Sequence, residues 1–227
     1  MEIIWTEIDA VRSSTLTGLN NTNIFIPAIY PHLSGELGVL ILYIMLINER
    51  DTRHERLLQV ANEMMTAART APKGKGIDII EVMMVTEETI DYLSKAMLDY
   101  SEKTGMKFIT RDAKNILLAE AVILIGTKQQ TQSLNCGYCG FDTCAEKKTH
   151  PDVPCALNTV DVGIAIGSAC SVAADHRVDS RVMFSVGRVA QELNLMPGCS
   201  SIYGIPISGS TKNPFFDRVF TPPVTSK

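Results

Sequence analysis

The sequence predicts an α/β or α+β fold in which helices cover a central sheet. Segments with a helical period alternate with short apolar runs of the kind that form strands. The run AVILIG, residues 121–126, is apolar at nearly every position, which predicts a strand covered on both faces. The chain has 227 residues, 45% of them apolar, and can bury a substantial core as one large domain or two small ones.

Three elements are predicted in the first half of the regular region. Residues 48–72 begin with a capping asparagine and an acidic first turn, carry apolar side chains on one face and end at Pro72, which indicates an amphipathic helix. The run IDIIEVMMV, residues 77–85, predicts a buried strand. A second amphipathic helix is expected over residues 87–103.

The second half continues the alternation. The segment MKFIT, residues 106–110, is read as a possible short strand, and NILLAEA after it as a helical turn. Residues 158–176 are rich in glycine, alanine and serine, which suits a helix buried on all sides. A further helix is expected over 179–194, and the last strand over 201–208.

The first 44 residues hold neither a helical nor a strand period for long. One hypothesis is that the native chain starts at Met45; the alternative is an arm that packs on a partner subunit. The expected organisation is therefore an N-terminal segment of uncertain status, 1–47, followed by a single domain, 48–227.

Composition excludes several classes of function. The formal charge is −4 and no block of lysine and arginine is present, so nucleic acid is not an expected partner. The longest apolar run, residues 38–47, is about half of the roughly 20 residues that cross a bilayer, so no membrane span is expected. No secretory signal pattern is found at the N-terminus, and we expect a cytoplasmic protein.

Four of the six cysteines lie close together in the sequence NCGYCGFDTCAEKKTHPDVPC, residues 135–155. Their order is Cys136-x2-Cys139-x4-Cys144-x10-Cys155. Three close thiols and a fourth at a distance suit a [4Fe-4S] cluster, because a tight loop can wrap three irons while a later residue binds the last. Glycines directly after the first two cysteines allow positive φ angles that turn amide groups toward the cluster. The cluster segment is expected over 134–157.

Other interpretations of the cysteines remain open. A structural zinc site more often has two C-x2-C pairs, and only one is present. Two disulfides would need an oxidising compartment. His150 is read as a solvated loop residue rather than a ligand, Cys170 as a core residue and Cys199 as a loop thiol.

A second candidate site lies in ARTAPKGKG, residues 68–76. Cations, a hydroxyl group and flexible glycine amides together can bind a phosphate. Alone, such a turn is more often a helix C-cap with solvated lysines. The polar loop SGSTKNPFFDR near the C-terminus is similar, and its Lys212 is expected to meet the first segment.

Four motifs, AARTAPKGKGID, CGYCGFDTC, GIAIGSACSVAADHRVDSR and YGIPISGSTKNPFFDR, resemble the family of uncharacterised proteins containing a ferredoxin domain. The resemblance covers roughly residues 48–220. More distantly, the layout is similar to nitroreductase-type flavoproteins. The resemblance implies an α+β three-layer fold with a mostly antiparallel sheet between helices, and a homodimer in which the small-residue helix packs.

The same resemblance implies FMN as a second cofactor. Residues 204–206 would mark the end of the late strand, and Lys212 would reach the FMN phosphate. The paired arginines that often open nitroreductases are missing from this chain. The flavin-binding residues expected from the resemblance are Arg69, Thr70, Lys73, Gly74, Lys75, Gly209 and Lys212.

Three possible functions follow from these interpretations of the sequence. The first is an FMN-dependent oxidoreductase in which a [4Fe-4S] cluster passes electrons to a small substrate. The second is a non-catalytic ferredoxin-like electron carrier or redox sensor. The third is a zinc-stabilised interaction protein. No arrangement of residues for hydrolysis is found.

Overall fold

The computed structural model describes residues 23–31, 37–45 and 47–216, and side chains from residue 47 onward. The chain divides into two compact units, residues 1–53 and 54–227. In the first unit, β1 (Asn23–Pro31) and β2 (Leu37–Met45) form an antiparallel two-stranded sheet. The sequence did not predict these strands. They pair only with each other, so their residues need not alternate between a face toward a core and a face toward solvent. Most of the remainder of residues 1–47 lies outside the described residues.

The second unit contains a four-stranded sheet in the order β3-β4-β6-β5, and every pairing in it is antiparallel. Its strands are β3 (Ile80–Val85), β4 (Ala121–Lys128), β5 (Asp179–Ser180) and β6 (Cys199–Ser208). The seven residues from Ala121 to Thr127 are all buried, which confirms the expected doubly covered strand.

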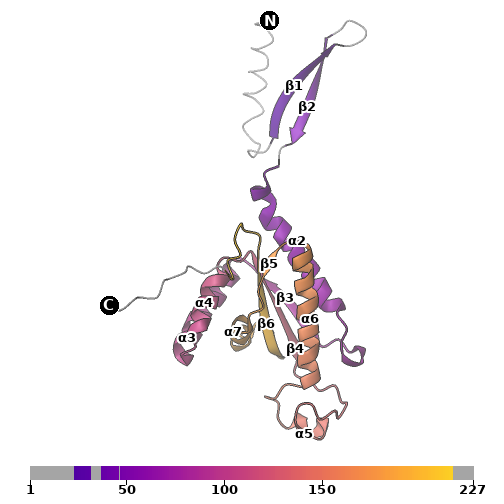
Figure 1. The fold of residues 1–227 in the computed structure, drawn as a ribbon, viewed down its shortest axis with the longest axis vertical. Coiled ribbons are helices and arrows are strands. Elements are labelled where there is room, and N and C mark those ends of the chain that lie inside the picture. Colours follow the sequence, from indigo (N-terminus) through magenta and orange to yellow (C-terminus); the bar gives the residue numbers. More distant parts are fainter. Residues whose placement is uncertain (1–22, 32–36, 46, 217–227) are drawn as a thin grey trace, which may run out of the picture. The chain divides into compact units, whose positions relative to one another are not determined.

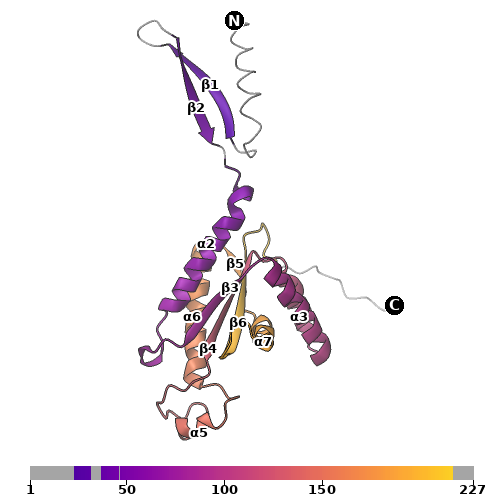
Figure 2. The ribbon, with the colours of Figure 1, turned by 180° about the vertical axis from the view of Figure 1, so that it is seen from behind.

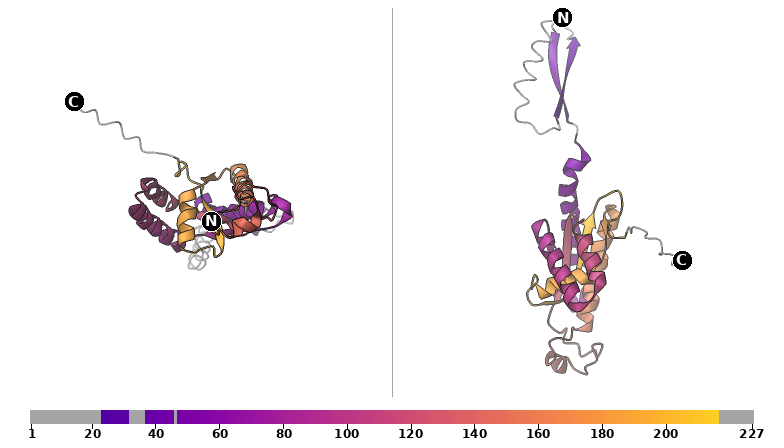
Figure 3. Two further views of the ribbon diagram at one scale, coloured as in Figure 1. Left: turned by 90° about the horizontal axis from the view of Figure 1, so that it is seen from below. Right: turned by 90° about the vertical axis from the view of Figure 1, so that its left-hand side faces the viewer.

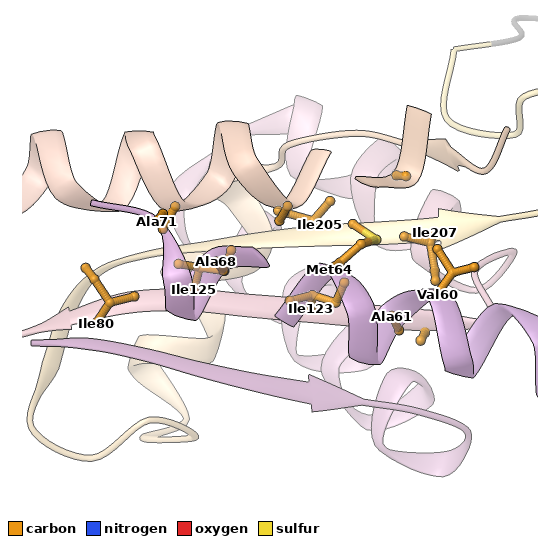
Figure 4. Close-up of a cluster of buried hydrophobic side chains, with 14 of the residues drawn as sticks. Val60, Ala61, Met64, Ala68, Ala71, Ile80, Ile123, Ile125, Ile205 and Ile207 are labelled. Atoms are coloured by element: carbon orange, nitrogen blue, oxygen red, sulfur yellow. The ribbon is translucent and has the colours of Figure 1, made fainter. Parts of the chain in front are cut away.

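Helices cover both faces of this sheet and make three layers (Figures 1 and 2). On one face, α2 (Glu49–Thr70) and α6 (Ala156–Asp175) enclose an apolar core to which three strands also contribute side chains. Met64 of α2, Ile123 of β4 and Ile205 of β6 are among its residues (Figure 4). On the other face lie α3 (Glu88–Thr104), α4 (Lys107–Ile116) and α7 (Phe184–Glu192). The predicted α+β three-layer architecture is confirmed.

Two predicted elements were wrong in type or extent. Residues 107–110, read as a strand, form the start of α4, and its buried residues Ile109, Ala113 and Ile116 follow a helical period that five residues could not reveal. The helix expected from residue 179 begins at Phe184 instead, because Asp179 and Ser180 pair with β6.

Close approach of α7 to the sheet depends on two glycines. A Cβ atom on Gly187 would lie 1.7 Å from the carbonyl oxygen of Ile202, and one on Gly204 would lie 2.2 Å from Val186. Gly204 therefore lies inside β6 at the contact with α7, which gives this part of the YGIP motif a packing role.

Within this chain, helix α6 is buried on one face only, whereas the sequence predicted burial on all sides. Ala165, Ala169 and Ala173 are fully buried in the core, whereas Val160 is 55% exposed and Ile164 40% exposed. Among the described residues, α6 is the one helix long and apolar enough to cross a membrane. Its buried alanines show that it packs as a core helix of this unit.

Candidate functional site

The four clustered cysteines line a single cavity. Cys136 and Cys139 lie in the loop after β4, Cys144 is the first residue of the short helix α5 (Cys144–Lys148), and Cys155 is the N-cap of α6. This loop lies at the N-terminal end of α6 (Figure 1 and the right-hand view of Figure 3). The fold thus brings together the four residues that the spacing singled out.

The loop around the cavity uses backbone conformations that are uncommon for most residues. Gly137 and Gly140 have φ angles of 71° and 85°, as the sequence predicted, and the Gly140 amide donates to the Gly137 carbonyl oxygen at 2.9 Å. Ser133 and Asn135 also have positive φ, 55° and 48°. A Cβ atom at either glycine would meet nothing within 4 Å, so the glycines are needed for their φ angles and not for space.

Asn135 and Cys144 hold the two halves of the loop together. The Cys144 amide donates to Asn135 Oδ1 at 2.8 Å, and the Asn135 amide donates to Cys144 Sγ at 3.4 Å. The hydrogen bond from the Asn135 amide lowers the pKa of Cys144 most. Burial acts in the opposite direction, and the amides of Leu134 and Ser133 and the Thr131 hydroxyl lower this pKa further. The cysteine spacing did not single out Asn135, although this residue stands directly before the first cysteine.

None of the six cysteines, all of which lie in the described part of the chain, forms a disulfide. Within the described ranges, no three cysteine, histidine or carboxylate side chains converge closely enough to hold a single metal ion. His150 is exposed, stacks on the Phe141 ring with centroids 4.8 Å apart, and does not line the cavity.

The remaining two cysteines lie away from the cavity. Cys170 is half-buried on α6 and packs against the core, as expected. Cys199 was expected in a loop, but it is buried and begins β6, where it pairs with Lys128. Burial raises the pKa of both thiols.

A buried polar cluster lies next to the cysteine cavity, and no sequence pattern predicted it. Gln132, which lines the cavity, donates from Nε2 to Asn158 Oδ1 at 3.0 Å and to Asp161 Oδ2 at 3.3 Å. Asp161 is 4% exposed and also accepts the Gly74 amide at 3.0 Å. These bonds join the cysteine loop, α6 and the segment after α2, across sequence separations of 29 and 87 residues.

The predicted phosphate-binding segment is held by bonds within the chain. Arg69 donates to Asp78 Oδ2 at 2.7 Å and to the Ile80 carbonyl oxygen at 2.5 Å. Burial raises the pKa of Asp78, but the Arg69 hydrogen bond and charge outweigh burial and hold that pKa below its usual value. The Thr70 hydroxyl donates to the Thr66 carbonyl oxygen at 3.1 Å.

The two lysines of this segment are also bonded to backbone carbonyl groups. Lys73 Nζ donates to the carbonyl oxygens of Ala68, Arg69 and Ala71 at the end of α2, and burial lowers its pKa. Lys75 Nζ donates to the Gln132 carbonyl oxygen at 3.1 Å, which is a second link to the cysteine loop.

Gly209 and Lys212 lie in the loop after β6, and Gly209 packs near a different part of α2. A Cβ atom on Gly209 would be 3.2 Å from Leu57 Cδ1, and Leu57 is about 18 Å along the helix from Arg69 at 1.5 Å per residue. Lys212 is exposed, and its carbonyl oxygen accepts from the Ser210 hydroxyl. The chain does not by itself gather these two residues with the Arg69–Lys75 segment.

Comparison with known proteins identifies the family. A sequence model of the family "Uncharacterized protein containing a ferredoxin domain (DUF2148)" matches residues 151–218. An uncharacterized protein from Archaeoglobus fulgidus is 37% identical over 182 residues, which are 77% of this chain and 98% of that protein. The chain belongs to this ferredoxin-domain family. The ferredoxin domain that names the family supports a redox role.

Solved structures with a similar course of the backbone include a nitroreductase and a flavoprotein. Nitroreductase CinD from Lactococcus lactis, in complex with nicotinic acid, is 16% identical with a TM-score of 0.49, over 74% of this chain and 84% of that chain. A BluB-like flavoprotein from Clostridium difficile 630 is 17% identical with a TM-score of 0.47, over 72% and 83% of the two chains. Both are far more distant from this chain than its archaeal relative.

Proposed function

We propose that this ferredoxin-domain protein is an electron-transfer protein that binds a [4Fe-4S] cluster through Cys136, Cys139, Cys144 and Cys155. The observation that carries the proposal is that all four cysteines line one cavity. No disulfide consumes these thiols. When bound, such a cluster supplies one-electron transfer.

The spacing of the four cysteines favours a cluster over a single zinc ion. A zinc ion draws four sulfur atoms to one point, at about 2.3 Å from the metal. In a cubane cluster each thiolate binds a different iron, so the sulfur atoms stay further apart. Three close cysteines and one at a distance suit the second case, and all four residues share one cavity.

The residues around the cavity suit an anionic cluster. The amide of Asn135 points at Cys144 Sγ, and those of Leu134 and Ser133 also lower the pKa of this thiol, so they stabilise its thiolate form. Positive φ angles at residues 133, 135, 137 and 140 give the loop the curvature of a backbone nest, an arrangement that binds anionic groups. Bonds from amides to cluster sulfur also tune reduction potential.

Purification without oxygen tests this proposal. The full-length protein is expected to be brown and to contain close to four iron and four sulfide per chain, which is the composition of the cubane. Metal analysis, a sulfide assay and the visible spectrum provide the measurement. A colourless protein that carries one zinc per chain would overturn the cluster assignment.

A second candidate function is an FMN-dependent oxidoreductase that receives electrons from the cluster. The observation that favours it is the link between the two predicted sites: Gly74 bonds Asp161, and Lys75 bonds the Gln132 carbonyl group beside the cysteine cavity. A flavin bound at this segment would lie near the cluster and could turn single electrons into two-electron chemistry.

The chromophore released by acid separates this enzyme from a carrier. A yellow compound identified as FMN, at close to one per chain, supports the oxidoreductase. Protein with a full complement of iron and no flavin after supplementation with FMN is a ferredoxin-like carrier or redox sensor. Either result leaves the cluster proposal intact, because iron and flavin are measured separately.

We also propose that the chain forms a homodimer through α6. Its exposed face contains Val160, Gly163, Ile164 and Gly167 and carries no charge over these positions. Additional Cβ atoms at both glycines would meet nothing within 4 Å, so a second helix can approach closely there. Light scattering should give the mass of two chains for the native protein and the mass of one chain for Gly167→Lys. The control variant Leu98→Lys, at an exposed position of α3, should stay dimeric.

A further inference from the structure

Lys147 is buried beside the cysteine cavity. Its residue is 4% exposed, whereas its neighbour Lys148 is exposed. It lies one turn after Cys144 on α5 and lines the cavity together with the four cysteines. Lys147 and Cys155 also both line a second, smaller hollow against the ends of β4 and β6.

No acceptor on the described part of the chain bonds the Lys147 ammonium group. The structure records no hydrogen bond or ion pair for it, in contrast to Lys73 and Lys75, which donate to carbonyl oxygens. Cations near a helix C-terminus are favourable, but this effect applies equally to exposed Lys148 and does not account for the burial of Lys147. The Lys147 side chain is buried, but its nitrogen is not among the buried atoms that lack a partner, so the charge keeps some solvent contact and remains available to an anion in the cavity that this residue lines.

The partner that fits is the anionic cluster itself. Four thiolates around a [4Fe-4S] core carry net negative charge, and reduction adds one further negative charge. A cation held beside the cluster stabilises the more negative, reduced state more strongly than the oxidised state. A positive charge at this position therefore favours electron uptake.

We propose that Lys147 raises the reduction potential of the cluster, and that it acts through its positive charge beside the Cys155 side of the cavity. This inference rests on the proposed [4Fe-4S] cluster. The step is a one-electron reduction: a one-electron donor, such as dithionite in the experiment, is oxidised as the cluster is reduced, and no bond forms or breaks.

A potentiometric titration of anaerobically purified full-length protein tests the proposal, with the reduced cluster followed by electron paramagnetic resonance. Lys147→Met removes the charge and keeps an apolar side chain of similar length. At the midpoint potential of the native protein, this variant should show about a tenfold lower ratio of reduced to oxidised cluster, a shift of about 59 mV to lower potential for a one-electron couple.

Two further variants separate charge from structure. Lys147→Arg keeps the charge and should titrate close to the native protein. Lys148→Met removes an exposed charge one residue away and should also titrate close to it, because solvent and salt screen that position. Should Lys147→Met fail to retain iron, Lys147→Gln is titrated in its place, and the same downward shift is required.

The outcomes distinguish this inference from the cluster proposal. Native protein without iron and sulfide refutes the cluster. Iron-loaded Lys147→Met or Lys147→Gln with an unchanged potential overturns the role of Lys147 and leaves the cluster in place. An equal shift in Lys147→Arg also overturns it, since a purely structural effect of the side chain would produce that result.

Discussion

The cysteine loop and the Arg69–Lys75 segment were both predicted to bind a cofactor, and they differ in how their polar groups are satisfied. In the Arg69–Lys75 segment, each cationic side chain bonds an acceptor on the chain: Arg69 bonds Asp78 and Ile80, Lys73 bonds the end of α2, and Lys75 bonds Gln132. In the cysteine loop, four thiols share a cavity without pairing, and buried Lys147 has no acceptor on the described residues.

This difference separates a structural role from a binding role. Buried polar groups in folded proteins are almost always bonded, so groups that converge on a cavity without partners indicate a ligand. Groups that already bond one another must give up those bonds before they bind anything else. The cysteine loop therefore has the stronger claim to a cofactor, and the Arg69–Lys75 segment has the stronger claim to a role in holding α2, β3 and α6 together.

The largest expected effect is loss of the cluster in Cys139→Ser. A serine hydroxyl is a poor substitute for a thiolate on iron, so iron should fall from about four per chain to near zero. The apolar cores on the two faces of the sheet contain no residue of the loop between β4 and α5, so the far-ultraviolet circular dichroism spectrum should stay close to that of the native protein. Iron analysis and the spectrum are measured on the same preparation.

The matched control for this change is Cys170→Ser. Cys170 lies on α6, away from the cavity, and should be replaceable without loss of iron. If Cys170→Ser loses iron as completely as Cys139→Ser, the assignment of the four ligands is wrong. If Cys139→Ser unfolds the whole unit, the cluster also stabilises the fold.

The next largest effect is expected for Asp161→Ala, which removes the link between the two regions. It leaves the Gly74 amide and one hydrogen of the Gln132 side-chain amide without this acceptor, and a buried unsatisfied donor costs about 1–3 kcal/mol. For a unit of this size, each kcal/mol lowers Tm by about 2–4 °C. Asp175→Ala, at the exposed end of the same helix, should leave Tm within about 1 °C by the same relation.

A smaller effect is expected in the reactivity of Cys144. Hydrogen bonds from the loop lower the pKa of Cys144, whereas burial raises the pKa of Cys170 and of Cys199. In metal-free protein the Cys144 thiolate should therefore persist to lower pH than the other two thiolates. The stabilisation that the loop amides give to the Cys144 thiolate is present at high pH and is lost as the pH falls through the lowered pKa. Iodoacetamide labelling from pH 6 to 9, read by peptide mass spectrometry, measures the order.

Asn135→Gly sharpens this measurement. Glycine keeps the positive φ of residue 135 but removes the Oδ1 atom that accepts the Cys144 amide. The labelling curve of Cys144 should then move toward higher pH, because the loop no longer fixes the amides that face its sulfur. An unchanged curve would show that the side chain of Asn135 does not position this thiol.

The sequence predicted the long elements of the fold because their patterns extend over many residues. The buried face of α2 runs from Leu57 to Ala68, about three turns, and the continuous apolar run of β4 fits a strand covered on both faces. The errors fall where a pattern is short: the first turn of α4 was read as a strand, and β5 has only two residues. The exposed face of α6 was missed because composition alone does not tell which side of a helix faces the core.

The candidate site also has a part that the sequence predicted and a part that it did not. The cysteine ligands are local in sequence, within 21 residues, so their spacing predicted a shared site. The bonds of Gln132 and Gly74 to Asp161 cross 29 and 87 residues and depend on how α6 packs against the loops, which no local pattern encodes. Lys147 is likewise an ordinary lysine in the sequence, and only its burial distinguishes it.

The smallest expected effect, Arg69→Ala, decides between the two roles of the Arg69–Lys75 segment. Arg69 and Asp78 are both more than 40% exposed, so their ion pair contributes about 0.2–1 kcal/mol, and its loss should lower Tm by less than about 4 °C. Lys95→Ala on the exposed face of α3 is the control and should leave Tm unchanged. If the segment is purely structural, the iron and flavin contents of Arg69→Ala both equal those of the native protein. Loss of FMN at unchanged iron would instead show that Arg69 leaves Asp78 to bind the flavin, because a change this small in stability cannot empty a cofactor site.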